Sequence, residues 1–402
     1  MTETDAGRQA GKLPGWTKAA RLAIASLALM VAGCQTMIPK GQPPAPPPVE
    51  QPKEPGVVTP GLPTDETRHR VALLVPMTGA NAAVGQSIAN ATTLAMLDTK
   101  TEKLRITTYD TNLGAAAAVT RALADGNKLI LGPLLAEDAR VIGPIARRAN
   151  VPVISFSNDV SVAGNGTFLM GYNPTQAIER VVDYAKSKGV SNFAGLVPSG
   201  AYGQRSGTAF LRAVEAAGGT VTSLAVYGRD QASVTAAIRK VDAASPYQAI
   251  LIADSGRFAM TAAPLIRKST DGASARILGT ELWNTESALA GSPAVRGAWF
   301  ASVPDTYYRT LADKYRARYG KAPFRLSALG YDSVLLTVRV AQDWKVGSPF
   351  PTARLFDTGG FAGIDGAFRF GRDGVAERAL EISQVNAGSF QTIDAAPRGF
   401  GK

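Results

Sequence analysis

From Arg68 onward, short apolar runs alternate with amphipathic stretches of helical length, and this feature constrains the fold most. Val71–Val75 is an uninterrupted apolar run of strand length, as expected for a parallel strand that helices cover on both faces. The helix-like stretches that follow are 84–97, 115–124 and 137–150, and they alternate with strand-like runs at 104–109, 129–131 and 153–155. This alternation predicts βαβ units and a doubly wound parallel sheet.

A second series of the same kind begins near Asn173. Its strand-like runs are 193–197, 221–227, 249–252 and 277–278, and its helix-like stretches are 203–217, 234–243 and 258–268. Further helices are predicted at 308–319 and 327–344. The last stretch, from Phe361 to Ile393, is predicted to form short antiparallel strands. We therefore predict an α/β fold of two doubly wound parallel-sheet lobes with a cleft between them.

The crossings between lobes set the predicted domain boundaries. The first lobe is predicted to comprise residues 68–171 and 305–350. The second is predicted to comprise residues 172–304 and 351–396.

The N-terminal segment has a different character. Four basic residues precede an apolar run from Leu22 to Gly33. This run is too short to span a bilayer, which takes about 20 residues, but it has the length of a signal-peptide core. It ends in Val31-Ala32-Gly33-Cys34, which resembles the bacterial lipobox, in which the cysteine is lipidated after cleavage. We predict a lipoprotein signal peptide over 1–33 and a membrane anchor on Cys34, the alternative being a buried or reactive free cysteine.

Residues 34–67 are predicted to be a tether. Prolines crowd the stretch from Pro39 to Pro63, which cannot bury a core and should be extended. A plain spacer is the favoured reading, and a PxxP partner site is the alternative. In the lipoprotein sorting pattern of Gram-negative bacteria, which this segment resembles, Gln35 after the lipidated cysteine implies the outer membrane, facing the periplasm, rather than the inner membrane.

Composition removes several functional classes. With one histidine, His69, and one cysteine, the chain has too few residues for a structural zinc site. A nucleophile–imidazole mechanism would need His69, which we expect to be exposed at the start of the sheet, away from its ligand end. The formal charge is +11, but the basic residues are scattered, which predicts a solvated surface and no nucleic-acid partner. We predict no enzyme activity, no cofactor and no metal, although counting alone does not exclude a pair of carboxylates.

Polar residues follow several predicted strands, where ligands of open α/β sheets bind. In the first lobe these are Thr78, Ser155, Ser157 and Asp159, and in the second they are Tyr202 and Glu281. Hydroxyls and helix N-termini accept a carboxylate, whereas a carboxylate or a phenol meets an ammonium group. We predict that these six residues bind a small, amino-acid-like ligand, the alternative for each being an ordinary cap or turn.

Five segments carry a family resemblance: Val71–Gly85, Leu129–Val160, Gly195–Gly219, Ser327–Leu336 and Phe361–Phe370. They resemble the type I periplasmic binding proteins, and among them the leucine/isoleucine/valine-binding class. The resemblance implies two lobes that close on an amino acid.

The resemblance also implies roles for particular residues. Ser157 and Asp159 match the loop that binds the ligand carboxylate and ammonium groups, and Tyr202 matches an aromatic residue that covers the ligand. Glu281, in Gly-Thr-Glu, matches an acid that pairs with the amino group. The chain departs from the family pattern at Ala136, where a serine is common, and near Val84, where an aromatic residue is replaced.

Two functions follow. The first is an extracytoplasmic lipoprotein that binds a small polar solute, such as an amino acid or a short peptide, in transport with an ABC permease or in sensing. The second rests on Val71–Leu97, which also resembles the outer-membrane lipoproteins that activate penicillin-binding proteins, without their long helical-repeat half. It is a regulatory partner of a peptidoglycan synthase, and a cleft plugged by Leu134, Leu135 or Phe156 would favour it.

Overall fold

The first lobe contains a parallel sheet that helices cover on both faces. The computed structural model describes residues 65–244 and 246–400, so the predicted signal peptide, Cys34 and most of the tether lie outside the described residues. The sheet has the order β2-β1-β3-β4-β5, with every pair parallel. The strands are β1 (His69–Val75), β2 (Leu104–Asp110), β3 (Leu129–Leu131), β4 (Val153–Ser155) and β5 (Thr167–Leu169), and the helices are α1 (Ala82–Thr99), α2 (Ala115–Ala124) and α3 (Ala136–Arg148).

The unbroken apolar sequence of β1 is explained by this double coverage. Leu73 belongs to the core cluster on the side of α1, whereas Leu74 packs with Val119 of α2 and Ile142 of α3. Successive side chains of a strand point to opposite faces, so both faces of β1 need apolar residues. The predicted parallel strand is confirmed.

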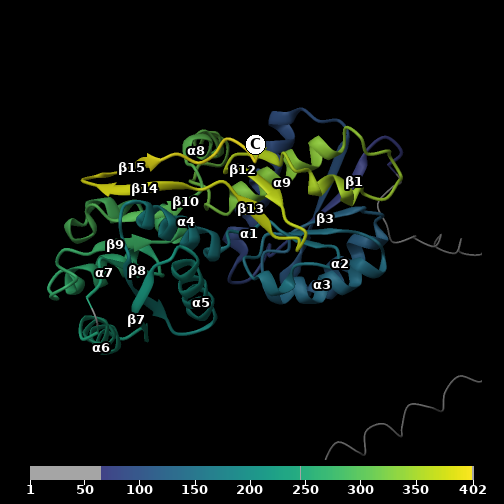
Figure 1. The fold of residues 1–402 in the computed structure, drawn as a ribbon. Helices are drawn as coiled ribbons and strands as arrows, with labels where there is room; N and C mark the ends of the chain where they lie inside the picture. The colour runs from purple at the N-terminus through teal and green to yellow at the C-terminus, as the bar shows by residue number, and fades with distance from the viewer. Residues whose placement is uncertain (1–64, 245, 401–402) are drawn as a thin grey trace, which may run out of the picture. The chain divides into compact units, whose positions relative to one another are not determined.

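The second lobe has a larger, mixed sheet of order β15-β14-β10-β9-β8-β6-β7 (Figure 1). Its parallel strands are β6 (Asn192–Pro198), β7 (Thr220–Tyr227), β8 (Ala249–Ile252), β9 (Arg276–Gly279) and β10 (Trp299–Ser302), and its antiparallel strands are β14 (Glu381–Asn386) and β15 (Ser389–Asp394). Its helices are α4 (Pro174–Ser187), α5 (Ala201–Ala216), α6 (Gln231–Asp242) and α7 (Gly256–Ile266). The predicted α/β fold is confirmed, and in the second lobe the antiparallel strands β14 and β15 extend the predicted parallel sheet.

Helix α4 was not predicted from the sequence, although its start is well specified. The Asn173 side chain accepts a hydrogen bond from the Thr175 N–H, and Pro174 occupies the first turn, where it needs no hydrogen-bond partner. Strands β5 and β10 and strand β13 (Ala376–Arg378) were also missed, because runs of three or four residues carry little periodicity.

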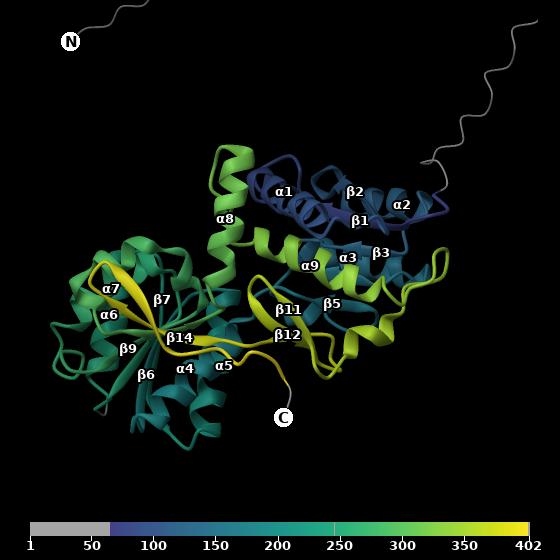
Figure 2. The ribbon, with the colours of Figure 1, turned by 90° about the horizontal axis from the view of Figure 1, so that it is seen from above.

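Two helices connect the lobes and return the chain to the first one. They are α8 (Thr306–Tyr319) and α9 (Ser327–Val340). Figure 2 shows α9 beside α1, and a hydrogen bond of 2.6 Å between the Ser87 and Ser327 hydroxyls joins the two helices. Short 3₁₀ turns complete the described chain at Thr111–Leu113, Val160–Val162, Glu281–Thr285, Ser287–Gly291, Pro293–Val295 and Thr352–Phe356.

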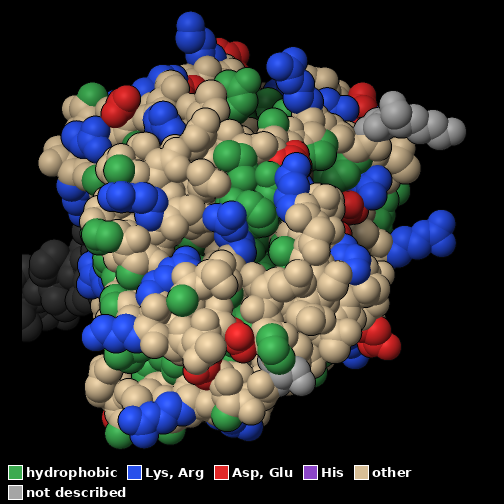
Figure 3. All heavy atoms as spheres, turned by 60° about the vertical axis from the view of Figure 1, so that its left-hand side comes forward, with side chains coloured by type: hydrophobic (Ala, Val, Ile, Leu, Met, Phe, Trp, Pro, Cys, Tyr) green, Lys and Arg blue, Asp and Glu red, His purple; other side chains and the backbone are tan. Residues whose placement is uncertain are grey.

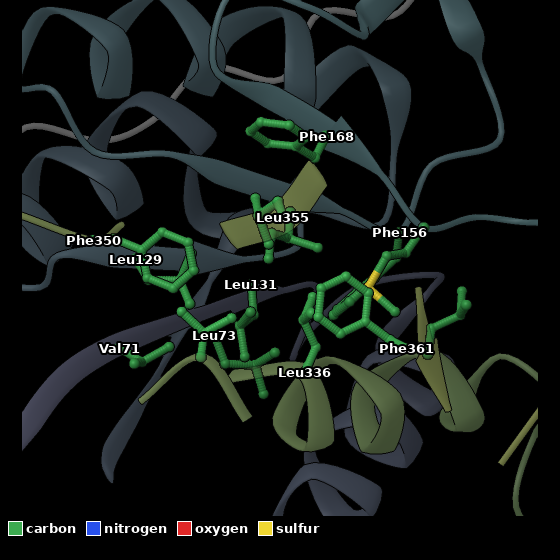
Figure 4. Close-up of a cluster of buried hydrophobic side chains, with 14 of the residues drawn as sticks. Val71, Leu73, Leu129, Leu131, Phe156, Phe168, Leu336, Phe350, Leu355 and Phe361 are labelled. Carbon is green, nitrogen blue, oxygen red and sulfur yellow. The ribbon is translucent and has the colours of Figure 1, made fainter. Parts of the chain in front are cut away.

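The prediction that the whole segment 351–396 belongs to the second lobe is wrong. It contains a three-stranded antiparallel sheet of β11 (Phe361–Gly363), β12 (Gly366–Phe370) and β13. Phe361, Leu355 and Phe350 pack in one cluster with residues of β1 and β3 (Figure 4). The chain rejoins the second lobe only at β14, because the aromatic residues of the preceding hairpin are buried against the first lobe.

His69 is not exposed, and that expectation is wrong. It begins β1, is 3% exposed, and stacks on Trp344 with ring centroids 3.9 Å apart. Burial lowers the pKa of its imidazole. The residue is therefore part of the core at the end of the first lobe opposite the carboxyl ends of the strands.

Three short segments link the lobes: 170–173 after β5, 303–305 after β10, and 379–380 after β13. Within the described ranges, no helix is both long enough and apolar enough to cross a membrane. Figure 3 shows one face, on which Lys and Arg side chains are scattered among apolar and acidic ones.

Candidate functional site

A cavity of about 430 Å³ lies between the lobes and receives residues from both. Several lining residues come from loops that directly follow strands: Leu134 and Leu135 follow β3, Phe156 follows β4, and Leu282 follows β9. This is where open α/β sheets place their ligands, and the volume suits a small organic molecule. Most of the exposed lining surface is apolar, although half of the lining residues have polar or charged side chains.

Two close contacts hold the helix that follows the first strand of each lobe, α1 after β1 and α5 after β6, against the end of that strand. A Cβ atom on Gly85 would lie 1.9 Å from the Pro76 carbonyl oxygen, and one on Gly203 would lie 1.6 Å from the Pro198 carbonyl oxygen. Only glycine permits these approaches of helix to strand end. The preceding residues, Val84 and Tyr202, therefore occupy equivalent places in the two lobes, and Val84 lines the cavity.

Glu281 is the predicted site residue that lines the cavity. The Tyr202 hydroxyl lies 3.4 Å from its Oε1 atom and donates to it, whereas Oε2 is buried without a hydrogen-bond partner. Burial raises the pKa of this carboxyl to about 7, although bonds from its own backbone, Tyr202 and Thr280 oppose the rise. The structure thus brings Tyr202 and Glu281 together, with only Glu281 on the cavity wall, and their role in ligand binding stays a prediction.

The predicted hydroxyls of the first lobe are used internally. Ser155 donates to the Pro133 carbonyl at 2.9 Å, and Ser157 accepts from the Asp159 N–H at 3.1 Å. Both are buried outside the cavity lining, and Thr78 is bonded to Asp110 at 2.7 Å. Hydrogen bonds of this kind within a loop are what the alternative reading, an ordinary cap or turn, predicts for each residue. The role of Thr78, Ser155 and Ser157 in ligand binding stays a prediction.

Asp159 also lies outside the cavity lining. Its carboxylate pairs with Arg140 of α3 at 2.7 Å and with Arg205 of α5 at 3.4 Å. These partners and the Ser161 N–H hold the pKa of Asp159 low, against the opposing effect of burial. Because Arg205 belongs to the second lobe, Asp159 bridges the lobes beside the cavity.

Two arginines of the cavity wall were not predicted. Arg325 precedes α9 and pairs with Asp305 at 2.8 Å and with Asp365 at 2.7 Å. Arg378 ends β13, is 6% exposed, and donates to the Met170 carbonyl at 2.6 Å. A sequence signal exists for Arg378: it alternates with buried Ala376, so it faces inward, but the strand itself was not recognised.

Four cavity-lining residues have buried polar atoms without a hydrogen-bond partner. They are Glu281 (Oε2), Ser302 (Oγ), Arg325 (Nε) and Arg378 (Nε and Nη1). Buried polar groups are nearly always paired in folded proteins, and each exception requires an explanation. In the part of the chain that the structure describes, no group of three or more His, Cys, Asp or Glu side chains is placed to hold a metal ion.

Two α/β lobes with a cavity between them at the ends of their strands define the architecture of a two-lobed binding protein. Residues 69–389 match the model of the periplasmic binding protein family, and the chain belongs to that family.

Among curated relatives, the uncharacterized protein RP748 of Rickettsia prowazekii is 26% identical over 142 residues, which are 35% of this chain and 38% of that protein. The penicillin-binding protein activator LpoA of Photobacterium profundum is 26% identical over 144 residues, which are 35% of this chain and 24% of that protein. The chain thus matches well under half the length of these relatives.

Solved structures match over a longer range. A putative branched-chain amino acid ABC transporter protein of Rhodospirillum rubrum has a TM-score of 0.71 and 21% identity, and the match covers 81% of this chain and 100% of that one. Full-length LpoA of Haemophilus influenzae has a TM-score of 0.63 and 19% identity, with 82% of this chain and 60% of that one covered. At these identities the likeness establishes the fold.

Proposed function

We propose that this chain is a non-enzymatic binding protein of the cell envelope, which holds a small, partly apolar solute such as an amino acid or a short peptide between its lobes. The observation that carries the proposal is a cavity of about 430 Å³ whose lining includes buried polar atoms without partners in the protein. An unpaired buried polar atom costs about 1–3 kcal/mol, which a ligand that pairs with it would offset. Transport with an ABC permease, or sensing, is the use of such binding that the family suggests.

A thermal-shift screen of amino acids, short peptides and organic acids tests this proposal with the full-length chain. A ligand at a hundredfold excess over its Kd stabilises the folded state by about 2.7 kcal/mol, which gives a clear rise in Tm. A screen in which no solute raises the Tm would contradict solute binding. A substitution that narrows the cavity from a partly exposed position of its lining, Leu282→Trp, should abolish any rise that is found.

The second candidate is a regulator that activates a penicillin-binding protein. The likeness to LpoA in sequence and fold favours it. Leu134, Leu135 and Phe156 do line the cavity, but they leave it open, which favours the solute-binding candidate. Glycan polymerisation by purified synthases, with and without the full-length chain, separates the two: activation supports the regulator, and unchanged polymerisation contradicts it.

We further propose that the lipid on Cys34 anchors the protein in the outer membrane, facing the periplasm, as Gln35 implies. The test is fractionation of wild-type and Cys34→Ser cells. Release of the variant into the soluble periplasm is expected, because two or more acyl chains are needed for stable anchoring. Wild-type protein in the inner-membrane fraction would contradict the sorting inference.

A further inference from the structure

The wall of the cavity that faces the segments linking the lobes carries two buried guanidinium groups. Arg325 lies just before α9, and Arg378 lies at the end of β13, next to the segment that crosses back to the second lobe. Tyr172, on the first crossing segment, lies between them in the same wall: the Arg378 guanidinium is 5.2 Å from its ring, and its hydroxyl donates to Asp365, which also pairs with Arg325.

The two arginines differ in how their charges are compensated. Arg325 has two carboxylate partners, Asp305 and Asp365. For Arg378, no carboxylate of the described residues lies within ion-pairing distance, and its one side-chain hydrogen bond goes to the neutral Met170 carbonyl. Asp332, the nearby acid, instead accepts from the Ile364 and Asp365 N–H groups. Removing a charge from water without a partner is costly, so a buried cation of this kind needs an anion.

A third polar atom belongs to the same wall. Ser302 ends β10 and is 1% exposed, and its Oγ atom has no partner. In the pairing of β10 with β14, Ser302 lies opposite Glu381. Glu381 is three residues after Arg378 in the sequence. The wall therefore offers free donors on Arg378, on Arg325 and on Ser302.

The opposite wall of the cavity carries side-chain donors only on two neutral amides, Asn81 and Asn158, and no cationic side chain. The loop hydroxyls expected to bind an acidic group, Ser155 and Ser157, are bonded within the first lobe and lie outside the lining. Their place on the cavity wall is taken by Leu134, Leu135 and Phe156. The cationic groups of the lining, Arg325 and Arg378, thus lie beside the crossing segments and not on the first-lobe loops.

We propose that the solute is a carboxylic acid with an apolar body, whose carboxylate binds Arg378, with Ser302 and the Nε–H of Arg325 as further donors, while the apolar body lies against Leu134, Leu135 and Phe156. This inference rests on the proposed function, because it assumes that the cavity binds a solute. It assigns the orientation of that solute and names Arg378 as the residue that selects for an acid.

The test compares acids with their amides by calorimetric titration of the full-length chain. The pairs are benzoate and benzamide, isovalerate and isovaleramide, and leucine and leucinamide, which differ mainly in the group that Arg378 would meet. At least one acid is expected to bind at least about tenfold more tightly than its amide, since hydrogen bonds to charged groups are the stronger ones. An amide that binds as tightly as its acid, or binding of neutral or cationic solutes alone, would overturn the inference.

Variants test whether Arg378 causes the preference for an acid over its amide. Arg378→Gln is expected to weaken the acid by at least about tenfold and to leave the amide unchanged. Arg372→Gln, which removes an exposed positive charge, is the matched control and should bind the acid like wild type. If Arg378→Gln does not fold, Ser302→Ala decides, because Ser302 Oγ has no protein partner to lose and its removal should weaken the acid alone.

The two levels of failure are distinguishable. A chain that binds no solute in the thermal-shift screen contradicts the proposed function itself. A chain that binds a solute with unchanged affinity in Arg378→Gln and Ser302→Ala keeps the proposed function and contradicts the carboxylate site.

Discussion

At the scale of single residues, the carboxyl group of Glu281 combines three unusual properties. It lines the cavity, one of its oxygens is buried without a partner, and its pKa is raised from 4.5 to about 7 by burial. Between these two values the unfolded chain releases a proton that the folded chain keeps. The free energy of unfolding therefore falls as the pH rises from about 4.5 to about 7, and the effect of this group is constant above that range.

Replacing Glu281 by Gln should remove this slope. A shift of one pKa unit corresponds to 1.36 kcal/mol, so the wild type is expected to lose at most about 3 kcal/mol over this range relative to Glu281→Gln. Urea titrations at several pH values measure the difference. Glu102→Gln, which removes an exposed acid far along the chain, distinguishes loss of this carboxyl from loss of one negative charge, and identical slopes in wild type and Glu281→Gln would contradict the prediction.

At the scale of elements, the contact of α9 with α1 is the most closely packed helix pair of the first lobe. Nearly every residue from Ser327 to Thr337 of α9 is buried, and Gly330 is the point of closest approach. A Cβ atom there would lie 2.8 Å from the Ile88 carbonyl oxygen and 2.9 Å from the Thr92 hydroxyl. Because the carbonyl belongs to the backbone, the helices would have to separate.

Gly330→Ala is therefore expected to lower the free energy of unfolding by about 1–3 kcal/mol, the usual cost of overpacking. Urea denaturation measures this loss. Gly291→Ala is the control, since a Cβ atom at Gly291 meets nothing within 4 Å. Equal effects of the two substitutions would show that the helix contact is looser than described.

At the scale of the whole described domain, charged side chains join the segments that cross between lobes. Arg325 is 10% exposed and links Asp305, on the second crossing segment, to the fully buried Asp365. The Tyr172 hydroxyl, on the first crossing segment, also donates to Asp365. Burial raises the pKa of Tyr172 strongly, so its hydroxyl keeps its proton for that bond.

Removing Asp365 should weaken this junction. Asp365→Asn takes away a buried partner of Arg325 and is expected to cost about 3–5 kcal/mol, the usual effect of breaking a buried ion pair. Asp313→Asn, which breaks an exposed pair with Arg316, should change stability by less than about 1 kcal/mol. Chemical denaturation compares the two, and a loss in Asp365→Asn as small as in the control would contradict the role of the junction.

The bridge between Asp159 and Arg205 joins the lobes beside the cavity, at 3.4 Å and with partial exposure. A pair of this kind contributes about 0.2–1 kcal/mol, so Arg205→Gln should weaken binding of the solute by at most about fivefold. Arg212→Gln, on the exposed side of the same helix, is the control. Calorimetry at low and high salt checks this, because salt should remove the difference between wild type and Arg205→Gln.

The sequence by itself determined the alternation of strands and helices, the parallel strands of the two sheets and the loops that follow these strands. These follow from local periodicity and from apolar runs such as Val71–Val75, which report burial on both faces whatever the partner is. Glu281 was found in this way, because it lies two residues after the end of β9.

Only the tertiary structure decided which groups meet. It placed Phe361 and its hairpin in the first lobe, buried His69 under Trp344, and turned Ser155 and Ser157 away from the cavity. It also brought Arg325 and Arg378, from different elements, to one wall. Burial and pairing of a polar side chain depend on residues distant in the sequence, so no local pattern could reveal them.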